Sequence, residues 1–291
     1  FVTQNKQIQQ FNSSFKKMDT PSSKWKGAQT LFYNEQPIPS KGRKMKITKN
    51  MIYKISSALL LAVMAYSPLQ AHDIKAKAGN AKMADFDVVH AKITASDNWL
   101  TFHMHVSGKA GKTTPTPTGK LEGSKVFSYV WPTKIDSSAV GFDKKQGILA
   151  MAITSHPDFD DTPLFDENGD GNLGNDGTVW HSHWVVLVPD DACGKGALKV
   201  KDIPAGSKPK LPVTWPGLPL LIDSPGYSPI INNQTVEVRV PFKNAKALKG
   251  IAFDGVTAGL RVNESAHAPL LCVVNVFDVA SGDLSLPGKV K

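Results

Sequence analysis

The sequence predicts a mainly β protein, with one antiparallel, sandwich-like β domain, long loops and few helices. Short segments rich in β-branched and aromatic residues alternate with clusters of Gly, Pro, Asn and Asp. Few stretches show the 3.6-residue period of an amphipathic helix. This pattern is typical of a β-sandwich or a β-barrel. The expected strands are Asp85–Thr94, Trp99–Val106, Lys125–Trp131, Gly147–Thr154, Thr178–Val188, Thr235–Pro241, Val256–Asn263 and Leu270–Val279.

The first 71 residues are expected to lie outside the folded domain. Residues 1–44 are polar and show no regular period, so we interpret them as an upstream extension that is not native, or as a disordered segment. Residues 45–71 combine basic residues, an apolar run and a final small residue, Ala71, which is typical of a secretory signal peptide. An exported domain is therefore expected over residues 72–291.

Charge argues against a nucleic-acid-binding role for that domain. The first 71 residues hold 11 of the 34 Lys and Arg and 2 of the 25 Asp and Glu, so residues 72–291 hold 23 of each sign. The basic character of the whole chain belongs to its leader. Both cysteines, Cys193 and Cys272, fall in the exported part, where we expect them to form a disulfide.

Two pairs of histidines are candidate metal ligands. His103 and His105 alternate with apolar residues in the expected strand Trp99–Val106, so both leave its apolar face. His181 and His183 repeat this spacing in Thr178–Val188. Neutral imidazole binds copper, zinc, iron and nickel, and two pairs on neighbouring or facing strands can converge on one ion. Copper and zinc both remain open on this reasoning.

His72 offers an alternative copper site. Cleavage after Ala71 would leave His72 as the first residue of the mature chain. A free amine and its imidazole can chelate copper together, as in the histidine brace of copper polysaccharide monooxygenases. A frayed terminus without a ligand is the other interpretation.

An acidic loop between the two histidine pairs resembles the first half of an EF-hand calcium loop. Asp, Asn and Asp alternate and a Gly follows, but Gly177 stands where a bidentate Glu is expected. We expect a structural calcium ion here, although a solvated turn would have a similar composition. The candidate ligands are Asp166, Asn168, Asp170, Asn172 and Asp176.

Several motifs together resemble a known family. A leader that ends in Ala-His-Asp, the stretch "FHMH", the loop "DENGDG" and the stretch "VWHSHW" are similar to the copper-repressible, surface-associated copper-binding proteins of methanotrophs. This family includes CorA, which is unrelated to the magnesium channel of that name, and the C-terminal copper-binding part of MopE.

The resemblance implies a role in copper acquisition. It implies one copper ion, mainly Cu(I), bound by two histidines, a water and a tryptophan oxidised to kynurenine. In MopE the modified Trp and one ligand His are two residues apart, and no Trp-x-His occurs in this chain. The candidate histidines are therefore the same four, and the candidate tryptophans are Trp131 and Trp180.

The sequence thus predicts a secreted or outer-membrane-associated copper-binding protein that is not an enzyme. Its expected partners are a copper ion and a surface or outer-membrane copper-uptake protein. Two alternatives remain: a copper monooxygenase with a histidine brace at His72, and a calcium-stabilised structural β protein with incidental histidines.

Overall fold

The computed structural model describes residues 72–116, 118, 122–156, 179–263 and 270–291. The chain divides into two units, Phe1–Pro68 and Leu69–Lys291, and all of the described residues belong to the second. No described helix is long and apolar enough to cross a membrane. Of the predicted features, the acidic loop with Asp166, Asn168, Asp170, Asn172 and Asp176 lies outside the described residues.

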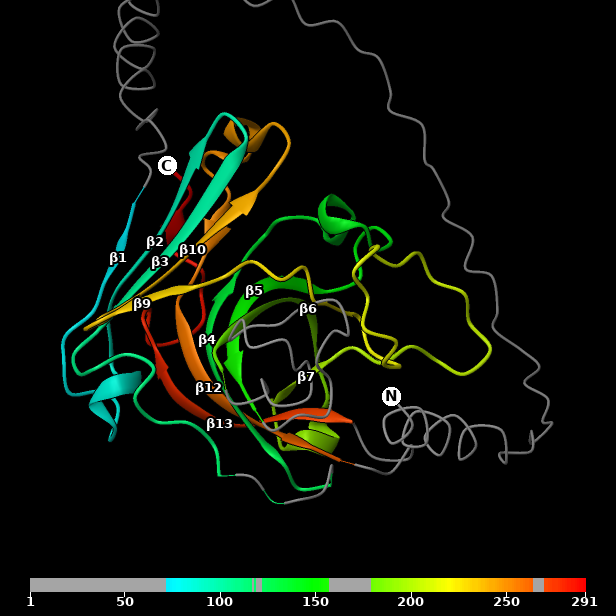
Figure 1. The fold of residues 1–291 in the computed structure, drawn as a ribbon, viewed down its shortest axis with the longest axis horizontal. Coiled ribbons are helices and arrows are strands. Elements are labelled where there is room, and N and C mark those ends of the chain that lie inside the picture. The colour runs from blue at the N-terminus through cyan, green and yellow to red at the C-terminus, as the bar shows by residue number, and fades with distance from the viewer. Residues whose placement is uncertain (1–71, 117, 119–121, 157–178, 264–269) are drawn as a thin grey trace, which may run out of the picture. The chain divides into compact units, whose positions relative to one another are not determined.

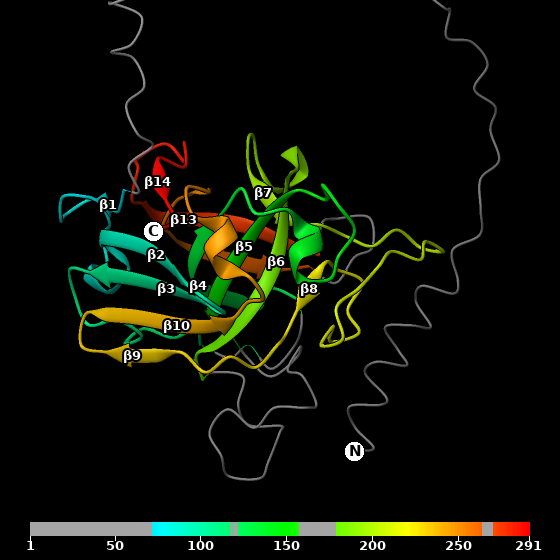
Figure 2. The same cartoon turned by 90° about the horizontal axis from the view of Figure 1, so that it is seen from above.

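A five-stranded antiparallel sheet forms one layer of the described domain (Figure 2). Along β3, the side chains of Leu100, Phe102, Met104 and Val106 are fully buried, and the alternate positions are partly exposed. The sheet therefore buries one face and leaves the other in contact with solvent. In spatial order its strands are β1 (Ile74–Lys75), β2 (Val88–Ser96), β3 (Trp99–Val106), β10 (Thr235–Pro241) and β9 (Ile230–Asn232).

The second layer is a closed barrel of six antiparallel strands (Figure 1). The pairing of β5 with β6 closes the ring, and β8 (Ile222–Asp223) pairs with the other edge of β6. In order around the ring the strands are β5 (Ile148–Ser155), β4 (Lys125–Pro132), β12 (Val256–Val262), β13 (Leu271–Val279), β7 (Leu198–Val200) and β6 (His181–Pro189).

The remaining described elements are short. A two-stranded sheet joins β11 (Ala252–Phe253) to β14 (Gly288–Lys289). The helices in the described part of the chain are all 3-10 turns. They are η2 (Ala84–Phe86), η3 (Ser137–Val140), η4 (Asp191–Cys193) and η5 (Ala245–Leu248).

Three strands of the barrel, β4, β5 and β6, are buried on both faces. Residues of β4, β5 and β6 that point out of the barrel pack against the five-stranded sheet, as the ring contacts of Trp131 and Trp184 with Phe102 show. The alternate residues, such as Val130, Ala152 and Val185, form a separate core inside the barrel. A strand buried on both faces does not alternate between apolar and polar residues. Its sequence therefore does not show which face lines the barrel interior.

The structure confirms the predicted mainly β, antiparallel fold with few helices. The larger sheet closes into a barrel, so the architecture is a sheet packed on a barrel. The predicted disulfide is also confirmed, since Cys193 in η4 is bonded to Cys272 in β13. The predicted strand Asp85–Thr94 begins later, at Val88, because Asp85 belongs to η2.

Candidate metal centre

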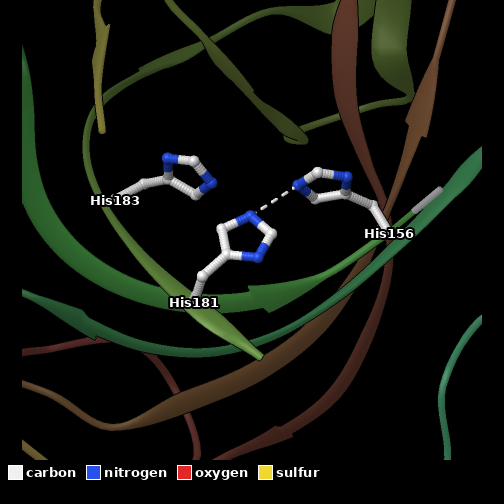
Figure 3. A group of neighbouring side chains, drawn as sticks. All are labelled: His156, His181 and His183. Atoms are coloured by element: carbon white, nitrogen blue, oxygen red, sulfur yellow. Dashed lines mark hydrogen bonds between the residues drawn. The ribbon is translucent and has the colours of Figure 1, made fainter. Parts of the chain in front are cut away.

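Three histidines meet inside the barrel where β5 and β6 pair (Figure 3). His181 pairs with Thr154, and His183 pairs with Ala152. Because side chains two residues apart share a face of a strand, both histidines point to the interior with Ala152. His156 follows the end of β5, two residues beyond Thr154, and so reaches the same group from the neighbouring strand.

The geometry of the group suits one metal ion. The ligand nitrogens of His156, His181 and His183 all lie within 4.8 Å of one another, and the three residues are 1%, 5% and 2% exposed. The Nε2 atoms of His156 and His181 are 2.8 Å apart. Two nitrogens bound at the usual 2.0–2.1 Å to a tetrahedral ion are about 3.3 Å apart. Small side-chain rotations would therefore bring all three imidazoles onto one centre.

Hydrogen bonds orient two of the rings. The Nδ1 atom of His181 lies 2.7 Å from the carbonyl oxygen of Val179, which can only accept, so Nδ1 carries the proton and Nε2 keeps its lone pair. In the contact between the two rings, His156 Nε2–H then donates to His181 Nε2. The Nδ1 atom of His183 lies 2.9 Å from Ser224 Oγ. With that Nδ1 donating to Ser224, the His183 Nε2 lone pair is also available to an ion.

A carboxyl group lies next in sequence to Ser224. Asp223 is 4% exposed, and burial raises its pKa to about 6. Its Oδ1 accepts a hydrogen bond from Thr214 Oγ1 at 2.6 Å, which lowers the pKa in part. The three-histidine group itself contains no carboxylate. Its ligand chemistry is that of three neutral imidazoles, which suits copper, zinc, iron or nickel.

His103 and His105 are not part of this group. Both lie on β3 and point away from the buried face of the five-stranded sheet. His103 Nδ1 lies 3.4 Å from Glu237 Oε2, and the ring centroids of His103 and His90 are 5.8 Å apart. Burial lowers the pKa of His103, and the hydrogen bond that Glu237 accepts from it opposes that shift. The predicted convergence of two His-x-His pairs is therefore replaced by one pair and a third histidine.

The two candidate tryptophans also lie outside the group. Trp131 is fully buried between the barrel and the sheet, and its Nε1 donates to the carbonyl oxygen of His103 at 3.2 Å. Trp180 packs on Tyr129 with ring centroids 5.0 Å apart, and its Nε1 donates to the carbonyl oxygen of Gly111 at 3.0 Å. Both indoles thus make contacts on the outer side of the barrel wall.

His72 is exposed at the start of the described domain, and it is not among the three histidines. Its carbonyl oxygen accepts a hydrogen bond from the Lys289 amide at 2.9 Å. This contact fixes the backbone of His72 beside β14. Among the described residues, the imidazole of His72 belongs to no group of metal ligands.

His156 is the residue that the sequence analysis missed. It occurs alone, just after a predicted strand, with no histidine two residues away. The available signal was its spacing. His156 lies two residues beyond Thr154 and four beyond Ala152, so the three side chains share a face if the strand continues. Only the pairing of β5 with β6 shows that this face meets the His181 pair.

No family model, curated protein or solved structure matches this chain. The assignment of the metal centre therefore depends on the geometry of the three histidines. These residues form a buried group that could hold a metal ion, and the described ligands do not by themselves name the metal.

Proposed function

We propose that this is an exported copper-binding protein, not an enzyme, which holds one copper ion, mainly as Cu(I), on His156, His181 and His183. The observation that carries the proposal is the burial of three convergent imidazoles in a group that, among the described residues, includes no carboxylate. A fourth position would be left to water or to a small ligand.

Charge favours Cu(I) over a divalent ion at this site. Three neutral imidazoles do not offset any of the charge of the metal, and the barrel core around them is aliphatic. The free-energy cost of burying an ion rises steeply with its charge, so a monovalent ion is favoured. Cu(I) also accepts few ligands, whereas Zn²⁺ is almost always four-coordinate in proteins.

The proposed setting is the cell exterior. The leader-like residues 45–71 and the disulfide between Cys193 and Cys272 are both typical of exported proteins. The resemblance to methanotroph surface copper-binding proteins supports a role in copper acquisition, with transfer to a surface copper-uptake protein. The oxidised tryptophan of that family is not part of this proposal, because Trp131 and Trp180 make their contacts elsewhere.

Anaerobic titration of the metal-free protein with Cu(I) tests the proposal. In competition with a chromophoric chelator, we expect one equivalent of Cu(I) to bind, and X-ray absorption should show three nitrogen neighbours. A His103→Ala/His105→Ala double variant is the matched control and should bind the same amount of copper. The proposed site would be contradicted if the parent protein failed to bind Cu(I). It would also be contradicted if the parent bound Cu(I) and the double variant did not.

A further inference from the structure

The described side chains do not fill the interior of the barrel. A cavity of about 570 Å³ lies within it and has His156 and His183 in its wall. Small barrels are normally filled by their inward-pointing residues. Here several inward positions carry small side chains, among them Ser128, Ala152 and Ala258, so the six strands enclose more volume than they fill.

The wall of this cavity is divided into an aliphatic part and a polar part. Aliphatic side chains from the barrel strands and from β8 make up most of the lining, for example Val126, Val130, Val185, Ile222, Leu260 and Leu271. The polar part lies on the adjacent strands β4, β5 and β6, where Ser128 pairs with Thr154 and Thr154 pairs with His181. A molecule inside would meet hydrocarbon on most sides and the histidine-bearing wall on one side.

Charged groups take little part in the lining. The only Lys, Arg, Asp or Glu among the described lining residues are Lys195 and Asp283, and both are exposed. Among the described residues, an ionised ligand inside the barrel would thus find no buried partner of opposite charge to offset the loss of its water. The cavity therefore favours an uncharged occupant.

Exposed valines mark a route into the cavity. Val274 and Val276 of β13 belong to the lining and are 41% and 56% exposed. Two neighbouring, strongly exposed aliphatic side chains beside an apolar cavity form a surface that an apolar molecule can cross. The cavity is therefore accessible from solvent on the β13 side.

We propose that the barrel binds one small, uncharged and largely hydrocarbon molecule, whose single polar group contacts the wall that carries His156 and His183. The volume falls within the range of small-molecule sites, which are mostly apolar with a few polar groups that fix orientation. This inference goes beyond the proposed function, because the cavity does not need a bound metal. With copper present, the polar group of the occupant would lie beside the ion.

Three naphthalene derivatives test both the cavity and its preference for charge. Binding of naphthalene, 2-naphthol and 2-naphthoate to the metal-free protein is measured by calorimetry and by the methyl NMR signals of its valines and leucines. We expect one molecule of 2-naphthol to bind, naphthalene to bind more weakly, and 2-naphthoate to bind at least tenfold more weakly than 2-naphthol. The shifted signals should include Val126, Val185 and Leu260. No saturable binding, or shifts confined to exposed methyl groups, would overturn the proposal.

Variants that fill the cavity provide the second arm of the test. Ala258→Phe and Leu260→Trp place larger rings in the interior, and each should weaken 2-naphthol binding at least tenfold. The exposed Ala247→Phe is the matched control and should bind as the parent protein does. Equal binding by a folded, filled variant would overturn the proposal, and if neither variant folds, the methyl shifts of the parent protein decide. A separate Cu(I) titration of the same protein distinguishes the two proposals. If the protein binds no copper but still binds 2-naphthol, the proposed function fails and the cavity proposal stands.

Discussion

His156 and His181 face each other through their Nε2 atoms, which are 2.8 Å apart although the residues belong to different segments of the barrel wall. A single hydrogen bond joins the two rings. His156 is the donor, because the proton of His181 is on Nδ1 and points to the carbonyl oxygen of Val179. A metal ion bound between the rings would replace that hydrogen. Because a neutral imidazole keeps one N–H when it binds a metal, the His156 proton would then move from Nε2 to Nδ1.

Removal of His156 should abolish tight copper binding. His156→Ala takes away one of three ligands, so the loss of Cu(I) affinity should exceed the roughly 10–100-fold that removal of an outer-shell partner costs. Chelator competition measures the change. His105→Ala, on the solvent-facing side of β3, is the control and should leave the affinity unchanged. Equal effects of the two substitutions would exclude the three-histidine site.

Ser224 should act as a positioning residue for His183. Its Oγ lies 2.9 Å from His183 Nδ1, so Ser224→Ala removes the group that orients the ring. We expect Cu(I) affinity to fall by roughly 10–100-fold while the stoichiometry stays at one ion. Ser207→Ala, at an exposed turn, should have no effect. An unchanged affinity in Ser224→Ala would show that packing alone orients His183.

The buried carboxyl of Asp223 should make stability depend on pH. Its pKa of about 6 in the folded protein lies above the ordinary value of 3.8. Between these values the folded protein holds a proton that the unfolded chain has released, so stability falls as pH rises from about 4 to about 6. Asp223→Asn stays uncharged. Its stability relative to the parent protein should rise by up to about 3 kcal/mol between pH 4 and pH 7.

Urea unfolding of both metal-free proteins at several pH values measures this difference. Taking the difference between variant and parent removes the contribution of every other ionisable group, since both proteins share them. A constant difference from pH 4 to pH 7 would show that Asp223 ionises normally in the folded state.

The disulfide should contribute strongly to the stability of the barrel. Cys193 and Cys272 are 79 residues apart in sequence, and the bridge connects η4, which follows β6, to β13. Closing a loop of this length in the unfolded chain is worth roughly 4 kcal/mol. The Cys193→Ser/Cys272→Ser double variant should lose about that free energy of unfolding. If reductant and the double substitution both leave urea unfolding unchanged, the bridge has no such role.

The sequence predicted the strands well because local patterns define them. The alternation of Leu100, Phe102 and Met104 identified the buried face of β3, and that face is fully buried in the structure. The closure of the barrel was not predictable in the same way. It depends on the pairing of β5 with β6, which is a long-range contact that no local period encodes.

The candidate site was predicted in part for a related reason. The spacing of His181 and His183 showed that they share a face, but β6 is buried on both sides, so the pattern did not show which face lines the barrel interior. His156 has no local motif, and its role depends on the register between two strands. The His103 pair has the same spacing as the His181 pair but lies on a half-exposed strand of the other layer.

The register of β5 against β6 decides whether the proposed metal centre can form. A slip of one residue would turn His181 and His183 out of the barrel and bring Ser182 and Trp184 into it. An ion that needs both histidines together with His156 can bind only the chain whose strands are correctly aligned. Such an ion would disfavour misaligned barrels during maturation, in addition to the role proposed for it in the finished protein.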